Sequence, residues 1–316
     1  MQRRVFWVAY NLDRIAAIST GRPFGIAEED IDVEYPEDID DEAIVENQFL
    51  VEPRKHYTQP PTTMSLAIHN LRLRRIWADM KSSIYSIGQT PTSLPDGQIV
   101  DELKQRLRSW LAECPRPVAP DSANPAPYGS SKWFMLTYHH SVILLHRRAL
   151  VAHSKQNYAP APGMTSIYLE CAESGTVLCN VYQELYFGST ISHTWGALHI
   201  LFLGGLTFLY CLWVDPSCRR LYRRDVVAST CTACTVVLVI MTERWFAAQP
   251  FRDAFRVLAN ATQSMLAEEE ERGENEPTLP VLNALTSEGM SQHLAGISGM
   301  GMCSTVEHIL GEMIQQ

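Results

Sequence analysis

The stretch that decides the fold runs from Gly196 to Val214 and reads GALHILFLGGLTFLYCLWV, which is 19 residues without a charged side chain. A second uncharged stretch, VVASTCTACTVVLVIM, follows from Val226 to Met241. Neither shows the alternation of apolar and polar residues that marks a half-buried strand. A helix that is apolar all round is buried in a core. We therefore expect helices over 194–214 and 222–246, and we place them at the centre of the core.

The same two stretches also permit a membrane hairpin, because 19 uncharged residues come close to the length of a spanning helix. Three glycines lie in the first stretch, and Ser and Thr are scattered through the second. This composition favours buried core helices over membrane spans, so no membrane association is predicted.

The N-terminal segment repeats its apolar residues at steps of three and four, which is the spacing of one helix face. Gly21 and Pro23 then end the helix. We expect the apolar face to be buried, and its residues are Val5, Val8, Leu12, Ile15 and Ile18.

A second helix is predicted after Thr62 and Thr63, a pair that can cap its start. A third helix runs from Ile99 to Trp110 and ends before Pro115. Basic residues interleave on the polar face of the second helix, whose apolar stripe is Leu66, Leu73, Ile76, Met80, Ile84 and Ile87.

Further helices are expected at about 131–152, 166–187 and 250–270. The predicted fold class is all-α: a single large bundle of packed antiparallel helices with polar, partly disordered connectors.

One helical domain over residues 1–270 is expected, because no obvious linker divides the apolar segments. The tail, residues 271–316, is rich in Gly, Ser and Met from Glu274 onward and has only weak periodicity. We predict that this tail is partly disordered, with a short docking helix near Val306 to Ile314.

The net charge of -9 is concentrated in two surface segments. Residues 28–46 hold 11 acidic side chains and no Lys or Arg, and a second acidic run extends from Glu268 to Glu276. Outside these segments the chain is mildly basic and has no strong nucleic-acid patch. Because like charges repel and Pro36 disfavours helix before it, residues 28–46 are predicted to be a solvated connector.

One part of this connector, Asp38 to Glu42, is similar to the aspartate-rich magnesium motifs of isoprenoid diphosphate enzymes, where clustered carboxylates bind diphosphate through metal ions. Such an all-α, magnesium-dependent enzyme would need Asp40 and Asp41, and replacing both by alanine would inactivate it. The carboxylates would have to project from a rigid helix into an apolar cavity, whereas Pro36 and the acidic run favour a connector. The enzyme is kept as an alternative, and the favoured interpretation is that the protein is not an enzyme.

The eight cysteines lie far apart, and the N-terminus has no signal-peptide architecture, which favours a reduced intracellular compartment. Cys231 and Cys234 have zinc-knuckle spacing but no second pair, and His139, His140 and His146 are other metal-ligand candidates. We interpret both sets as core or partly buried helix residues. No phosphate loop or nucleophile elbow is recognisable, so we predict no catalytic, cofactor-binding or metal-binding residue in this chain.

Four blocks of the sequence carry a resemblance to a known family. The first block is Arg3–Arg14 with Gly21–Ile26 and Glu29–Val33, and the others are Tyr138–His140 with Leu144–Arg147, Gly204–Trp213, and Glu243–Trp245 with Phe251–Phe255. In this order they resemble the fungal-specific transcription factor domain, or middle homology region, of the zinc binuclear cluster regulators. Arg148 stands where that family commonly has a proline.

The resemblance implies a regulatory helical domain that controls transcription by RNA polymerase II in a fungal nucleus, often for a metabolic or secondary-metabolite gene cluster. It also implies protein partners or self-association. DNA and zinc would be bound only by a separate module of six closely spaced cysteines, which the printed sequence does not contain.

The resemblance covers about residues 3–260, and the family's domain normally begins further upstream, so a domain truncated at its N-terminus is expected. The alternative within the family is a partner or interfering protein that does not bind DNA. The target genes, the DNA site and any effector ligand stay unspecified.

Overall fold

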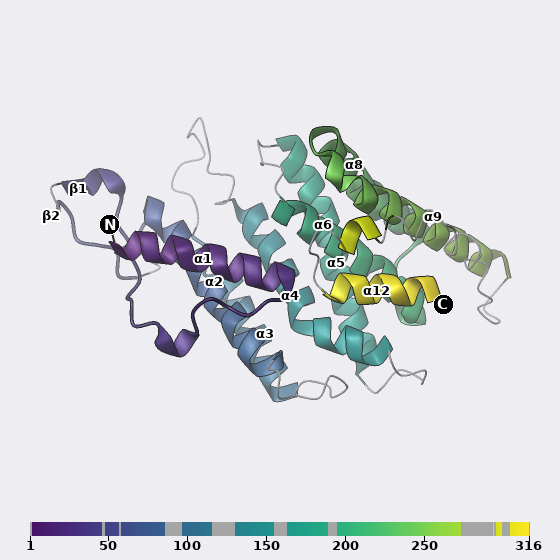
Figure 1. The fold of residues 1–316 in the computed structure, drawn as a ribbon, viewed down its shortest axis with the longest axis horizontal. Coiled ribbons are helices and arrows are strands. Elements are labelled where there is room, and N and C mark those ends of the chain that lie inside the picture. The colour runs from purple at the N-terminus through teal and green to yellow at the C-terminus, as the bar shows by residue number, and fades with distance from the viewer. Residues whose placement is uncertain are drawn as a thin grey trace. The chain divides into compact units, whose positions relative to one another are not determined.

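The computed structural model describes residues 2–45, 48–56, 58–85, 97–115, 130–154, 163–188, 195–272, 293, 295–298 and 304–315. Ile87 of the second predicted helix and residues 273–292 of the predicted tail lie outside the described residues. Helices dominate the described chain, which confirms the all-α class (Figure 1). The exception is a short antiparallel pair, β1 (Ile44–Val45) with β2 (Gln48–Phe49).

The helices lie close to their predicted ranges. They are α1 (Gln2–Thr20), α2 (Thr63–Ile84), α3 (Gly97–Ala112), α4 (Ser131–Ser154), α5 (Met164–Gly188), α6 (Trp195–Val214), α7 (Pro216–Leu221), α8 (Arg224–Arg244), α9 (Gln249–Arg272) and α12 (Ser304–Gln315). Helix α7 was not predicted from the sequence. Asp215 begins this short helix by accepting a hydrogen bond from the Ser217 amide at 2.6 Å, and Pro216 fills the first turn.

The described residues group into two compact units. Those from 2 to 138 form an N-terminal unit, and those from 139 to 315 form a C-terminal unit, so the boundary falls within α4. The predicted division into a domain over 1–270 and a tail from 271 stays a prediction.

The C-terminal unit is built around α6, as the uncharged stretch predicts. Every residue from Leu201 to Trp213 is buried, and α5, α8, α9 and α12 pack on this helix. The predicted docking helix is α12, with Val306, Leu310 and Met313 buried. A helix that is apolar on all sides is stable only where other elements cover every side, and these four helices cover α6.

Two helices, α6 and α8, are long and apolar enough to cross a membrane by length and composition alone. The apolar window of α6 is 89% buried against the rest of the protein, and that of α8 is 50% buried. The burial of α6 is typical of a core helix, whereas α8 is only half buried. The absence of membrane association stays a prediction.

The N-terminal unit contains α1, α2, α3 and the first turns of α4. Thr62 begins α2 with a capping box: its hydroxyl accepts from the Met64 amide, and the Ser65 hydroxyl accepts from the Thr62 amide at 2.9 Å. The predicted cap is therefore confirmed. Helix α2 packs against α1 on one side and α3 on the other.

The prediction of the buried face of α1 was wrong. Val5, Val8 and Leu12 are 64%, 60% and 61% exposed, whereas Trp7 and Tyr10 are buried at 2% and 4% exposure. Helix α1 carries two apolar stripes, and aromatic rings remove much more surface from water than Val or Leu. The aromatic stripe is accordingly the one that packs on α2 and the connector.

The connector over residues 28–46 is not helical, as predicted, apart from short 3-10 turns at Glu28–Asp30 and Asp41–Ala43. It is, however, less solvated than predicted. Ile39 is 1% exposed, the Tyr35 ring stacks on Trp7 with centroids 4.7 Å apart, and Trp7 Nε1 donates to the Glu34 carbonyl at 2.8 Å. Apolar residues between the acidic ones thus hold the connector against α1.

Candidate functional site

The first block of the family resemblance builds a buried arginine near the end of α1. Arg14 is fully buried, its Nη2 donates to Glu28 Oε1 at 2.6 Å, and its Nη1 donates to Asp13 Oδ2 at 2.5 Å. The guanidinium also lies 4.1 Å from the centroid of the Tyr10 ring and 4.2 Å from that of Phe24. The two carboxylates compensate for the lost hydration of the guanidinium. These residues form a structural anchor that fastens the connector to α1.

The acidic segment that resembles a magnesium motif binds the start of α2. Asp38 Oδ1 accepts from Thr62 Oγ1 at 2.5 Å and from Ser65 Oγ at 2.7 Å. Asp40 Oδ1 accepts from the Thr63 amide at 2.7 Å. Carboxylates are stabilised at a helix N-terminus by its unpaired amides and its dipole. Asp40 therefore caps α2, and Asp38 is engaged with the hydroxyls of Thr62 and Ser65.

The other metal-ligand candidates are also engaged elsewhere. Asp41 Oδ1 lies 2.5 Å from Arg4 Nη1. Cys231 and Cys234 are buried on α8, where burial raises the pKa of the Cys231 thiol to about 12. Among the described residues, no group of three or more His, Cys, Asp and Glu is placed to hold a metal ion.

The three histidines weighed as ligands lie on α4 in the C-terminal unit. Burial lowers the pKa of His139 to about 4, and its Nδ1 lies 3.1 Å from Ser174 Oγ. His140 is buried, and His146 Nε2 lies 2.8 Å from Glu170 Oε2. These contacts fit helix packing, while the expectation that the chain binds no cofactor remains a prediction.

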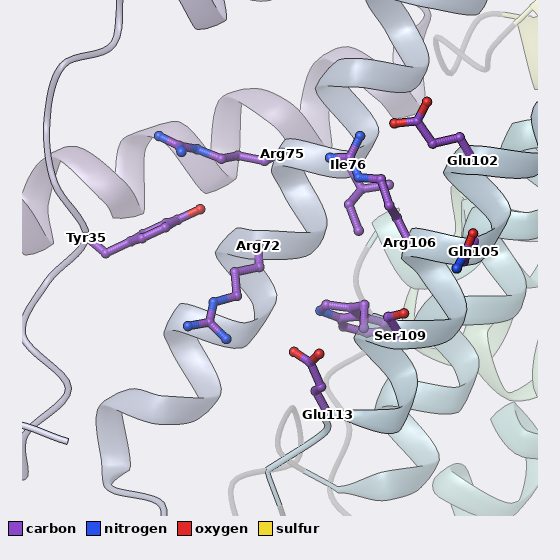
Figure 2. Close-up of a pocket in the computed structure, with 10 residues that line it drawn as sticks. Tyr35, Arg72, Arg75, Ile76, Glu102, Gln105, Arg106, Ser109 and Glu113 are labelled. Carbon is purple, nitrogen blue, oxygen red and sulfur yellow. The ribbon is translucent and has the colours of Figure 1, made fainter. Parts of the chain in front are cut away.

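A groove of about 440 Å³ lies between α2 and α3 in the N-terminal unit (Figure 2). Its apolar residues are Ile76 of α2 and Trp110 of α3, which are 6% and 4% exposed. Tyr35 of the connector lines the groove on the side of α2. Charged and polar side chains surround this apolar base.

Arg72 and Arg106 bring positive charge to the groove from its two helices. Arg72 is exposed and makes no hydrogen bond or ion pair with any residue that the structure describes. Arg106 is held by Asp79, with 2.5 Å between Nη2 and Oδ2. One guanidinium is therefore free and the other is fixed.

Arg75, one turn after Arg72, is the third arginine of the groove. Its guanidinium lies 4.9 Å from the centroid of the Tyr35 ring, which is within cation–π range. Its Nε is 3.9 Å from Glu28 Oε2 and makes no hydrogen bond with a described residue. The aromatic contact thus positions Arg75 without satisfying all of its donors.

The wall formed by α3 is mixed in charge. Gln105 and Ser109 are exposed polar residues on it, and Glu102 and Glu113 lie at opposite ends of the groove (Figure 2). Neither glutamate carboxylate makes an ion pair or hydrogen bond with a described residue. The groove thus presents cations in its middle and acids at its ends.

Comparison with known proteins identifies the N-terminal unit. Residues 1–112 match the family described as the Fungal specific transcription factor domain. The chain carries a fungal specific transcription factor domain. The matched residues include α1, α2 and α3, so most of the groove residues lie within the fungal domain.

Curated relatives of the chain are fungal regulators. The Positive regulator of purine utilization of Emericella nidulans is 26% identical over 297 residues, which is 84% of this chain and 28% of that protein. The Pyrimidine pathway regulatory protein 1 of Saccharomyces cerevisiae is 29% identical over 220 residues, 66% of this chain and 22% of that protein. The chain therefore spans less than a third of the length of these relatives. No solved structure matches it.

The groove in the fungal domain was not predicted from the sequence. The signal was present in part, because basic residues interleave on the polar face of α2 and Arg72 and Arg75 share that face at a spacing of three. What the sequence does not show is which residues of α3 face them, since that depends on how the two helices pack.

Proposed function

We propose that the chain is the regulatory part of a fungal transcription regulator that acts on RNA polymerase II transcription in the nucleus. The observation that carries this proposal is the match of residues 1–112 to the fungal domain. The alignment with the Emericella nidulans regulator covers 84% of the chain, so it extends beyond the matched domain into the C-terminal unit.

The target genes we propose are genes of metabolism. Two relatives are described by purine utilization and by the pyrimidine pathway, which are both metabolic processes. By the resemblance to zinc-cluster regulators, DNA would be contacted by a zinc module and not by these 316 residues. In this account the chain works by binding other proteins or a second copy of itself, and it is not an enzyme.

Deletion of the gene followed by transcript sequencing tests this function. We expect a defined group of metabolic transcripts to change, and we expect re-expression of the wild-type chain in its native locus to restore them. A fluorescent fusion should accumulate in the nucleus.

Unchanged transcripts across media that differ in carbon and nitrogen source would contradict the regulatory role. A fusion that stays out of the nucleus under all of these media would contradict the proposed location.

A further inference from the structure

We propose that the exposed apolar face of α1 pairs, in antiparallel orientation, with the same face of a second copy of this chain. The inference deepens the proposed function, on which it rests for its biological role, by naming the surface through which the chain binds itself. Pairing is a property of the purified protein. It can therefore be absent while the regulatory role holds, and the two are tested by different measurements.

The exposed face of α1 is apolar over about three turns. Val5, Val8 and Leu12 are 64%, 60% and 61% exposed, and Ala9 and Ala16 are exposed beside them. None of these five side chains is charged. A single exposed aliphatic side chain is common on a protein surface, whereas a contiguous row of them is typical of an interaction site.

The spacing of this row indicates that its partner is a helix. Val5, Val8, Leu12 and the half-buried Ile15 follow one another at steps of three, four and three. These are the a and d positions of a heptad, along which the side chains of two helices interlock. The periodicity that predicts a buried face of α1 thus fits contact with another helix, since α2 packs on the aromatic face instead.

The row is complementary to itself when two copies of α1 run antiparallel. In one register Val8 lies opposite Leu12 of the second copy. The same register places Val5 opposite Ile15 of the second copy, and twofold symmetry repeats both pairs. Ala9 then lies near the twofold axis and faces its own counterpart, where its small side chain permits a short distance between the helix axes. A second copy therefore satisfies the whole row without any other partner.

Charge favours the antiparallel over the parallel orientation. The first turn of α1 carries Arg3 and Arg4, and its last turn carries no charged side chain. Antiparallel pairing places the arginines of each copy beside the C-terminal end of the other helix, where the helix dipole stabilises cations. Parallel pairing would bring the arginines of both copies together. Ion pairs with Glu34 and Asp41 of the connector reduce this difference without reversing it.

The pairing is expected to be weak and reversible. The seam of each copy consists of Val5, Val8, Leu12 and Ile15 with small flanking residues. A stable interface involves more, about 20–30 residues on each side. We therefore expect a dissociation constant on the order of 10 μM.

Analytical ultracentrifugation of the purified chain measures the pairing. We expect a monomer–dimer equilibrium over concentrations that bracket this dissociation constant. Val8→Glu should weaken association at least about tenfold, because it places a carboxylate against Leu12 in both symmetric layers of the seam. Val51→Glu is the matched control, since Val51 is 58% exposed and lies outside α1, and its dimerisation should equal that of the wild type. Circular dichroism should show unchanged helix content in both variants.

Cysteine cross-linking measures the orientation of the two helices. In the antiparallel register Ala9→Cys brings two thiols together near the twofold axis. Oxidised glutathione should then join them in a disulfide between two copies, and it is itself reduced to two molecules of glutathione. Ala16→Cys is the control, because Ala16 lies opposite Gln2 of the second copy and far from its own counterpart. The wild-type chain under the same oxidant gives the background from its native cysteines.

A chain that stays monomeric at every concentration overturns the proposal and leaves a helix of a different protein as the occupant of this face. Equal dimerisation of Val8→Glu and Val51→Glu also overturns it, because the dimer would then form through another surface. Cross-linking of Ala16→Cys as efficient as that of Ala9→Cys overturns the antiparallel register.

Discussion

Arg14 is the residue that ties α1 to the connector, and its burial makes the two carboxylates beside it necessary. Arg14 is 0% exposed, and its guanidinium lies within 2.6 Å of both Glu28 and Asp13. A charge in this position cannot regain water if its partners are lost. Packing and ion pairing therefore explain Arg14, the last residue of the family block from Arg3 to Arg14.

Replacing Glu28 by Leu should destabilise the protein by about 3–5 kcal/mol, because it leaves the buried Arg14 with only one carboxylate partner. Glu34→Leu is the control, since its ion pair with Arg3 is exposed and contributes about 1 kcal/mol or less. Urea unfolding monitored by tryptophan fluorescence gives both free energies. Equal losses in the two variants would show that Arg14 does not depend on this pair.

His69 gives the stability a dependence on pH. It stacks on Trp110 with ring centroids 4.6 Å apart, and burial, with a smaller contribution from the charge of Arg72, lowers its pKa to about 4. The unfolded chain, with a histidine pKa of about 6.5, binds the proton more readily than the folded protein. Stability is therefore full above about pH 6.5 and falls as the pH is lowered toward 4.

We expect His69→Phe to reduce the loss of unfolding free energy between pH 7 and pH 4.5, since the aromatic stack is kept and the proton site is removed. His139, whose pKa is also lowered to about 4 by burial, would account for part of the loss that remains. His56→Phe is the control, because His56 is exposed. A pH dependence that is unchanged in His69→Phe would refute this assignment.

At the scale of elements, α5 and α6 pack closely against each other at Gly175. A Cβ added at Gly175 of α5 would lie 2.5 Å from the carbonyl oxygen of Gly204 and 2.9 Å from the Cβ of Phe208, both on α6. Only a residue without a side chain allows the two backbones to approach this far. Glycine is required here by packing and not by backbone conformation.

Gly175→Ala should therefore destabilise the protein by about 1–3 kcal/mol, because overpacking outweighs the better helix propensity of alanine. Gly311→Ala in α12 is the matched control: nothing lies within 4 Å of the added Cβ, so stability should rise by about 0.4–1 kcal/mol. Thermal unfolding of the two variants would decide the point. A Gly175→Ala protein as stable as the wild type would mean that α5 and α6 are further apart than the structure shows.

The helices could be predicted from the sequence wherever their range depends only on neighbouring residues. Apolar spacing and the stops at Pro and Gly gave most helix ranges, and the uncharged stretch at 196–214 identified α6 as the core helix. The buried face of α1 could not be chosen, since Val8 and Trp7 belong to competing apolar stripes and the choice depends on what packs against them. The groove depends on the register of α2 against α3, which no local pattern specifies.

At the scale of the whole molecule, two helical units share one chain. The N-terminal unit holds the fungal domain, with its arginine anchor and its charged groove, and the C-terminal unit is built around α6. The alignment with the Emericella nidulans regulator extends over both units. The similarity to that regulator is therefore not confined to the N-terminal unit.

The measurement that tests the regulatory role most directly is a tethered reporter assay, with the chain fused to a foreign DNA-binding domain in a fungal cell. The account predicts that the fusion changes reporter transcription relative to the DNA-binding domain alone. It also predicts a weaker effect for Gly175→Ala at equal protein level and an unchanged effect for Gly311→Ala. A folded, nuclear fusion that leaves the reporter at the level of the DNA-binding domain alone would contradict the account.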